Sequence, residues 1–392
     1  MLNAKIAQDF WSKAKNAIDY LSPLVPEREE VLHTSFLALA TGKNHFQIGP
    51  PGCGKTYLPE IIANGIVDAD VFYKLLSKSI PIDEVLGSTS LQGIKQEDYR
   101  RAIDGFLPTA HIAILDEVYK AGDALCNPLL RMMNERKYRN GRTVLDVPLV
   151  SVFGMSNEMY EGPALAAFDS RWTFKHVVDY LTDKNSFGKM IDATRDGSTP
   201  DISQFDICLD ELAAARSELR NVAWTEGCTE VLWTLREEFR KEGLPFDDRK
   251  AVWVARDVLP AQAMLDGRDY VDTEDFAVLQ HVLWSNPEHV NQIRSIILKI
   301  ANPVQDEVDR MVKTARDALK TARKIVKETP GDEAVRIQAG ADAQTDCSDV
   351  ISDLEILGKS AKGKSLDIVT SGIKKVKRVD ETVIREILRI RS

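Results

Sequence analysis

The chain has 392 residues, of which 44% are hydrophobic, with a formal net charge of −9 and a pI of about 5.4. This length allows two or three domains with cores of their own, and the acidic balance argues against a generic binder of nucleic acid or anionic membranes. The five cysteines form no CxxC pair, and neither a membrane-length apolar run nor a signal-peptide pattern occurs, so we expect a reducing cytoplasmic environment.

A glycine-rich motif follows the first predicted strand. Apolar spacing predicts helices over 4–21 and 27–40 and a strand over 45–48. The strand leads into the sequence Gly49-Pro50-Pro51-Gly52-Cys53-Gly54-Lys55-Thr56, and a helical pattern over 55–63 follows. The motif fits a phosphate-binding loop, in which glycines let backbone N–H groups face a phosphate and the next helix N-terminus favours an anion. Lys55 would reach the β and γ oxygens and Thr56 would ligate Mg²⁺; the alternative is a simple glycine turn.

Two acidic residues end a later apolar run. A strand is expected at 71–76, and glycines break the pattern over 82–104 into an interrupted helix that carries a small hairpin or loop insertion. The run 112–117 has the composition of a buried parallel strand, whose end is where open α/β sheets place ligands. Asp116 would hold Mg²⁺, directly or through water, and Glu117 would polarise the attacking water. The alternative is an acidic strand end without a role.

A hairpin and a further strand follow a helix over 123–135. The hairpin, 136–147, turns at Asn140-Gly141. Its basic residues make it either a solvated hairpin or a pore-facing element; they are Arg136, Lys137, Arg139 and Arg142. The strand 149–154 leads to Asn157, which would orient water or touch the γ-phosphate, or would cap a helix. A short helix at 164–168, Arg171 and a β-rich run at 173–178 complete this region.

Helical periodicity replaces the strand pattern after residue 181. Helices are predicted at 184–194, 204–219, 226–241, 248–265 and 273–284. Apolar residues spaced by three and four from Val304 to Ile325 form a narrow stripe, which suits a helix hairpin or coiled coil and needs a partner face. Helical pieces at 332–357 and 380–391 flank Lys359–Arg378, which is predicted to be a mobile loop. The predicted domains are 1–180, 181–290 and 291–392.

Together these motifs resemble the AAA+ ATPases. The insertion at 82–104 and the hairpin at 136–147 resemble the branch that carries a helix-2 insert and a pre-sensor hairpin. Four sequences resemble the MoxR group: Gly49-Pro50-Pro51-Gly52, Leu115-Asp116-Glu117-Val118, Asn134-Glu135-Arg136 and Ser156-Asn157-Glu158. Phe106-Leu107-Pro108, Lys120-Ala121-Gly122, residues 134–141 and Gly267-Arg268-Asp269 resemble its RavA subgroup. The resemblance covers about residues 5–290, and beyond 300 only a helical C-terminal extension matches.

The resemblance implies a fold and a set of roles. The fold is an α/β AAA+ P-loop αβα sandwich with an all-α lid. Residues 49–56 bind ATP, with Lys55 and Thr56 as Walker A. Asp116 and Glu117 are Walker B and Asn157 is sensor 1. Arg171 stands at the arginine-finger position, although Trp172 replaces the more usual Phe, and Arg249 at the sensor 2 position, although its Asp247-Asp248 context departs from Ser-x-Arg. Surface ion pairs are the alternative for both arginines.

The resemblance further implies a Mg²⁺-dependent ATPase that forms a hexameric ring. It would act as a chaperone or remodeller of a protein client, with a von Willebrand factor A-domain partner. A nucleotide-gated scaffold with little turnover and a chelatase-like or nucleic-acid motor are the alternatives. Residues 300–392 would form a helical docking arm with a basic flank, or an arm that only stabilises the ring. The six histidines show no metal-binding spacing.

Overall fold

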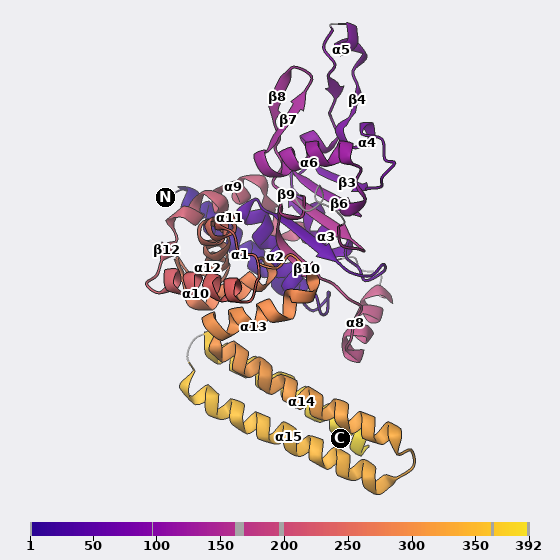
Figure 1. The fold of residues 1–392 in the computed structure, drawn as a ribbon, viewed down its shortest axis with the longest axis vertical. Coiled ribbons are helices and arrows are strands. Elements are labelled where there is room, and N and C mark those ends of the chain that lie inside the picture. The colour runs from indigo at the N-terminus through magenta and orange to yellow at the C-terminus, as the bar shows by residue number, and fades with distance from the viewer. Residues whose placement is uncertain (1, 96, 161–167, 196–199, 362–363, 390–392) are drawn as a thin grey trace. The chain divides into compact units, whose positions relative to one another are not determined.

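The computed structural model describes residues 2–95, 97–160, 168–195, 200–361 and 364–389 (Figure 1). The chain divides into two compact units, Met1–Ile293 and Arg294–Ser392. The second begins close to the predicted boundary at 291, whereas the boundary predicted at 180 lies inside the first unit and stays a prediction. Among the described residues, no helix is both long and apolar enough to cross a membrane.

A five-stranded parallel sheet forms the centre of the first unit, in the order β10-β1-β9-β6-β3. Its strands are β1 (Asn44–Ile48), β3 (Val71–Leu75), β6 (Ile112–Asp116), β9 (Ser151–Ser156) and β10 (Trp172–Val177). Every residue of β1 and β9 is buried, as expected for strands covered on both faces. The predicted α/β class is therefore confirmed, and the carboxyl ends of β1, β9 and β6 lie side by side.

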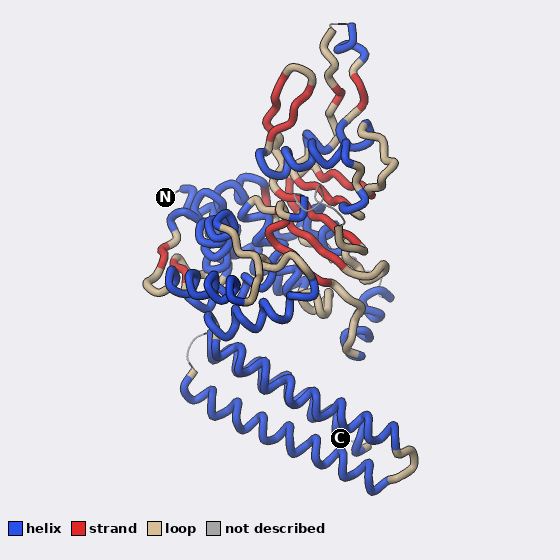
Figure 2. Tube along the Cα trace, viewed as in Figure 1, coloured by secondary structure: helices blue, strands red, loops and turns tan. Residues whose placement is uncertain are grey.

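Helices predicted from apolar spacing lie around this sheet (Figure 2). They are α1 (Leu2–Leu21), α2 (Glu29–Thr41), α3 (Tyr57–Asn64) and α6 (Asp123–Glu135). Helix α1 packs on α2 and on α9 (Leu209–Glu218) instead of on the strands. Helix α2 packs on β1 and β10, and α3 packs on β6. Helix α2 ends at Gly42, which has a left-handed φ of 66° and so closes the helix without the strain that a side chain would cause.

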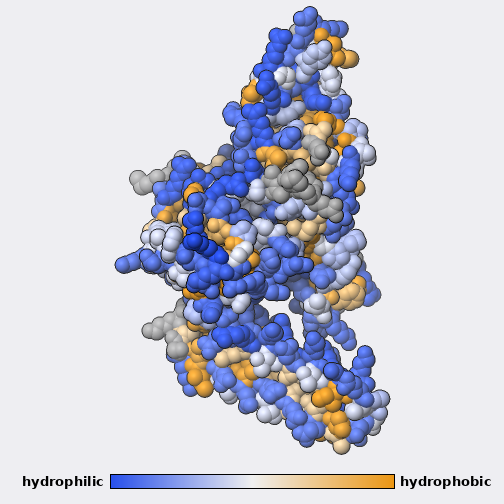
Figure 3. Space-filling model, in the orientation of Figure 1, coloured by the Kyte–Doolittle hydropathy of each residue, from blue (hydrophilic) through white to orange (hydrophobic). Residues whose placement is uncertain are grey.

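The insertion and the hairpin extend together from one side of the sheet (Figure 1). The insertion contains α4 (Asp83–Leu86), β4 (Ser88–Thr89), α5 (Leu91–Lys95) and β5 (Arg101–Ala102), and the hairpin contains β7 (Lys137–Asn140) and β8 (Thr143–Asp146). The Asn140 side chain accepts from the Arg101 N–H at 2.7 Å and donates to its carbonyl at 3.0 Å, which joins the two elements. Hydrophobic groups lie among hydrophilic ones toward the end of this protrusion (Figure 3), and Leu91 is 77% exposed.

Arg136 does not contribute to a basic hairpin surface as predicted. It has a left-handed φ of 53° and caps α6. Its guanidinium donates to the carbonyls of Met132, Gly42 and Val150 at 3.1, 2.8 and 3.0 Å. The residue therefore fastens the end of α6 to the starts of β1 and β9, instead of lying on the hairpin surface.

The α-helices after β10 are α8 (Lys184–Arg195), α9 (Leu209–Glu218), α10 (Cys228–Lys241), α11 (Asp248–Trp253) and α12 (Leu259–Leu265). They mostly follow the predicted order, and the structure differs from the prediction in three places. Helix α9 begins later than predicted because Ile207–Cys208 pairs as a strand with Ile66–Val67. A π turn, Val254–Val258, separates α11 from α12, where Pro260 offers no N–H to the helix ladder. Residues Thr273–His281 form a 3₁₀ helix, η6. The short helix predicted at 164–168 lies mainly outside the described residues.

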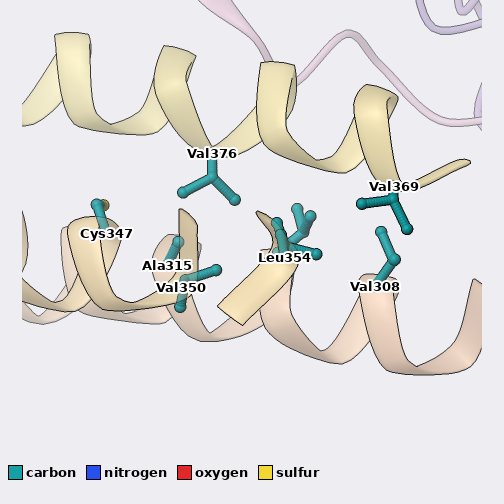
Figure 4. Close-up of a cluster of buried hydrophobic side chains, with 8 residues drawn as sticks. Val308, Ala315, Cys347, Val350, Leu354, Val369 and Val376 are labelled. Carbon is teal, nitrogen blue, oxygen red and sulfur yellow. The ribbon is translucent and has the colours of Figure 1, made fainter. Parts of the chain in front are cut away.

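Among its described residues, the C-terminal unit contains three long helices, α14 (Pro303–Glu328), α15 (Glu333–Ser360) and α16 (Lys364–Thr382). A π turn, Val383–Leu388, follows α16. The apolar stripe of α14 is covered by the other two helices, as Figure 4 shows. The prediction of a mobile loop over Lys359–Arg378 is wrong, because most of this range belongs to α16. Val369, Val376 and Val383 recur every seven residues and are at most 1% exposed, so packing outweighs the Gly, Ser and Lys content.

Candidate nucleotide-binding site

The predicted phosphate loop joins β1 to α3, and its glycines are required by the backbone. A Cβ on Gly49 would lie 1.7 Å from the carbonyl oxygen of Val178. Gly52 and Gly54 have left-handed φ values of 79° and 80°. Because other residues adopt this region only at a cost, the loop needs glycine at these positions.

Residues distant in sequence brace the loop from outside. Arg28 donates to the Cys53 carbonyl at 3.2 Å, and the Tyr180 hydroxyl donates to the Pro51 carbonyl at 2.9 Å. The Cys53 thiol donates to the Val178 carbonyl at 3.4 Å. Sequence reasoning missed Arg28 and Tyr180, since nothing in their local sequence points to the loop. These bonds fix the loop to the segment that leaves β10.

Lys55 is buried in the loop, with 7% of its surface exposed. Its ammonium donates to the carbonyls of Gly49 and Pro50, both at 2.8 Å, and to the Asn157 side-chain oxygen at 2.7 Å. These acceptors are all neutral, and no salt bridge to Lys55 occurs among the described residues. A buried cation within a glycine cradle fits an anionic phosphate group.

Asn157 forms hydrogen bonds with both Lys55 and Glu117 and so connects the two residues. Glu117 follows β6, is 9% exposed and has a left-handed φ of 54°, which is uncommon for a residue other than glycine. Its carboxylate accepts a hydrogen bond from the Asn157 amide nitrogen and pairs with Lys120 at 3.3 Å. Three predicted residues, Lys55, Glu117 and Asn157, therefore meet where β1, β6 and β9 end.

The remaining predicted ligands suit a Mg²⁺ ion held through a nucleotide. Asp116 is the last residue of β6, and its carboxylate accepts the Glu117 N–H at 2.9 Å. Thr56 immediately precedes α3. The described residues contain no group of three or more His, Cys, Asp or Glu residues that could hold a metal ion. Mg²⁺ needs no such group, because it is commonly bound by one or two protein oxygens, water and substrate phosphates.

Arg171 lies at the opposite end of the sheet. It immediately precedes β10, and its carbonyl accepts from the side chain of Asn44 at 3.1 Å, where β1 begins. The phosphate loop follows the other end of β1, roughly 16 Å away for five residues at ~3.3 Å each. The structure therefore does not bring Arg171 to Lys55 of the same chain.

Arg249 lies in the same region as Arg171. Its guanidinium is 5.0 Å from the ring centre of Trp253, whose ring also contacts the ammonium of Lys43, the residue before β1, at 4.7 Å. Burial and the positive charge of Arg249 together lower the pKa of Arg171. The two predicted arginines are thus near each other and away from the phosphate loop.

A buried ion pair connects the Arg171 segment to the Glu117 segment. Asp169 accepts from the ammonium of Lys175 at 2.7 Å and from the hydroxyl of Tyr119 at 2.6 Å. Lys175 and Asp169 are only 1% and 4% exposed. Sequence reasoning missed this pair, although a lysine inside a β-rich run was a signal for a buried charge.

Comparisons with known proteins identify the family. A protein-family model described as the MoxR domain in the MoxR-vWA-beta-propeller ternary systems matches residues 12–215, and one for an AAA lid domain matches residues 228–297. A candidate ATPase from Cytophaga hutchinsonii has a similar fold, with a TM-score of 0.60 and 20% identity, over 76% of this chain and 97% of that chain.

Two archaeal relatives extend the match along the chain. The uncharacterized protein MJ0812 of Methanocaldococcus jannaschii is 28% identical over 87% of this chain and 89% of its own length. MJ0079 of the same organism is 29% identical over 75% of this chain and 77% of its own length. The structural protein ORF618 of Acidianus two-tailed virus is 26% identical over 48% of this chain and 31% of its own length. With the glycine cradle, the acidic strand end and the parallel sheet, these matches show that the chain belongs to the MoxR family of AAA+ ATPases.

Proposed function

We propose that the chain binds ATP with Mg²⁺ and hydrolyses it to ADP and phosphate. The single observation that carries the proposal is the contact of Lys55 and Glu117 through Asn157, which places a phosphate-binding cation and a carboxylate base beside each other. Lys55 and the loop N–H groups hold the phosphates, while Thr56 and Asp116 serve as Mg²⁺ ligands. Mg²⁺ supplies charge neutralisation for the phosphates when it is bound.

Glu117 is the general base of the proposed reaction. Its carboxylate accepts a proton from the attacking water, whose oxygen forms a bond to the γ-phosphorus while the bond to the β–γ bridging oxygen breaks. Asn157 holds the Glu117 carboxylate and would orient the same water. Lys120 pairs with this carboxylate at 3.3 Å and so helps to fix its position.

We also propose that the protein works as a hexameric ring. Arg171 and Arg249 lie at the far end of β1, so they reach the nucleotide of a neighbouring subunit instead of their own. This explains why both predicted arginine roles need a second copy of the chain. The five cysteines are free thiols, which supports a reducing, cytoplasmic environment.

The test of ATP hydrolysis uses two variants. Lys55→Ala should abolish tight ATP binding, because the phosphates lose their buried counter-charge. Glu117→Gln should bind ATP normally and release phosphate at least about a hundredfold more slowly. Binding is measured with a fluorescent ATP analogue and turnover by phosphate release. Wild-type turnover in Glu117→Gln would contradict the general-base role.

The finer biological role is proposed to be that of a RavA-like chaperone or remodeller of a protein client. A von Willebrand factor A-domain protein is the proposed partner, as the description of the matching MoxR domain suggests. We propose that residues 300–392 form its docking arm, since α14 carries a basic flank. The basic residues of this flank are Arg310, Lys313, Arg316, Lys320, Arg323, Lys324 and Lys327.

Truncation before Pro303 tests the docking role. The truncated protein should hydrolyse ATP and assemble like the full chain, while it no longer captures the partner in a pulldown. A matched variant, in which Lys313, Lys320 and Lys327 become Glu, keeps the helices and reverses charge on the arm. Loss of assembly after truncation would favour a structural arm, and unchanged capture by both variants would contradict docking.

A further inference from the structure

A basic cavity of about 350 Å³ lies where β1 and β10 begin. Its charged lining residues are six cations and one acid: Lys43, Arg136, Arg171, Arg216, Arg220, Arg256 and Asp257. It is therefore a concentrated region of positive charge in a chain whose net charge is −9. Such a cavity favours an anionic occupant.

Four of these six cations form no salt bridge with any residue that the structure describes. Arg136 is held by backbone carbonyls, and Asp257 pairs with both Lys43 and Arg256 at 2.9 Å. This leaves three arginines, which form no salt bridge with any residue that the structure describes: Arg171, Arg216 and Arg220. The buried Nε of Arg171 also has no hydrogen-bond partner among the described residues.

Arg216 is exposed as a whole residue, but its guanidinium lies against the backbone of another helix. It belongs to α9, and its guanidinium lies against Gly42 at the end of α2, where a Cβ would come within 2.3 Å of its Cζ. Arg220 follows one helical turn later, in the 3₁₀ turn Leu219–Asn221. Burial lowers the pKa of Arg216, and burial together with the charge of Arg216 lowers the pKa of Arg136 to about 10. The fold thus keeps cations together against their repulsion.

We propose that Arg216 and Arg220 bind, together with Arg171, the phosphates of the ATP held by the phosphate loop of a second copy of the chain. This inference rests on the proposed ATPase function. A guanidinium donates two parallel hydrogen bonds to a phosphate, and a triphosphate has enough oxygens for several arginines. The ATP of the same chain is excluded, because the length of β1 separates it from the cavity.

The double variant Arg216→Gln, Arg220→Gln in the full chain tests this role. We expect the Kd of a fluorescent ATP analogue for the phosphate loop to change less than about threefold, while kcat falls at least about tenfold. Arg240→Gln is the matched control, because its side chain is 81% exposed on α10, outside the cavity. If the double variant does not fold, Arg220→Gln alone replaces it in the test, because this residue lies on an exposed turn. The single variant should also lower kcat.

Mixed assemblies show whether the arginines act on a neighbour. Subunits with Arg216→Gln and Arg220→Gln are mixed with Glu117→Gln subunits, and each type alone is expected to have reduced turnover. Recovery of turnover supports the proposal, because one type of interface then combines an intact base with intact arginines. If the mixture does not regain turnover, the proposal is wrong. It is also wrong if the double variant fails to assemble but each assembled ring keeps the wild-type kcat, because the arginines would then contact acidic residues of the neighbouring subunit.

The inference and the proposed function fail in different ways. If the wild type releases no phosphate from ATP, the proposed function itself is wrong. If the wild type is active, Arg171→Ala is inactive and the double variant retains full kcat, only the role of Arg216 and Arg220 is wrong.

Discussion

The two ends of strand β1 differ in how their charges are satisfied. At the carboxyl end, Lys55, Asn157 and Glu117 are connected by hydrogen bonds within one chain. At the amino end, Arg171 and Arg216 face a cavity without a salt bridge to any described residue. The first end holds a cation beside a carboxylate, whereas the second holds six cations and one acid, Asp257. We propose that each end is half of a catalytic site, which a second copy of the chain completes.

The largest expected effect is that of Arg171→Ala. An arginine that stabilises charge in a phosphoryl-transfer transition state contributes about 10³–10⁵ in rate, or ~4–7 kcal/mol. We therefore expect kcat to fall by a factor in that range, while ATP binding to the loop is preserved. Phosphate release by the assembled protein is the measurement.

Mixing experiments decide whether Arg171 acts between subunits. Arg171→Ala subunits mixed with Glu117→Gln subunits should regain part of the activity, because some interfaces then pair an intact arginine with an intact base. A dilute monomer that is fully active would refute the division of the site between two chains.

A smaller effect is expected from the buried pair that joins the two ends. Lys175→Met removes the cation that pairs with the buried Asp169 carboxylate, which among the described residues is then bound by the Tyr119 hydroxyl alone. We therefore expect the free energy of unfolding to fall by about 3–5 kcal/mol. Urea denaturation measures the change. The control is Lys137→Met, whose partner Asp146 is 84% exposed, and it should alter stability little. Equal losses in the free energy of unfolding for the two variants would show that the buried Asp169 pair contributes no more to stability than the exposed pair.

Local sequence patterns predicted the parallel sheet, and they singled out Lys55, Glu117 and Asn157, which the structure brings together. Strand β6 and the residues that follow it combine an apolar run with two acids, and the phosphate loop needs glycine at fixed positions. Both are short-range signals, because the backbone conformation of one segment dictates them. The family resemblance supplied the role of Arg171, which no local pattern implies.

Long-range features were beyond local patterns. Arg216 and Arg220 read as polar residues of a helix, and only the packing of α9 on α2 brings them to Arg171. The prediction of a loop at 359–378 was wrong because it relied on the Gly, Ser and Lys content and overlooked valines spaced seven residues apart. Gly154 was a missed signal, because a Cβ there would lie 2.4 Å from the ring of Trp172.

The smallest predicted effect concerns two histidines on β1 and β10, between the two ends. The side-chain oxygen of Thr34 is 3.0 Å from Nε2 of His45 and 2.7 Å from Nε2 of His176. Both rings are fully or almost fully buried, and the pKa of each lies well below its ordinary value. Burial is the main cause, and the charges of neighbouring histidines add to it: His176 for His45, and His281 and His33 for His176.

These histidines should make the protein less stable in mild acid. Below about pH 6.5 the unfolded chain binds protons that the folded chain excludes, so each histidine lowers the free energy of unfolding by ~1.4 kcal/mol per pH unit until its folded pKa is reached. His45→Gln removes one of these groups and keeps every carboxylate, so urea denaturation at pH 7.5, 6.5 and 5.5 should give a slope below pH 6.5 smaller by that amount. Identical slopes for both proteins would mean that His45 is protonated in the fold.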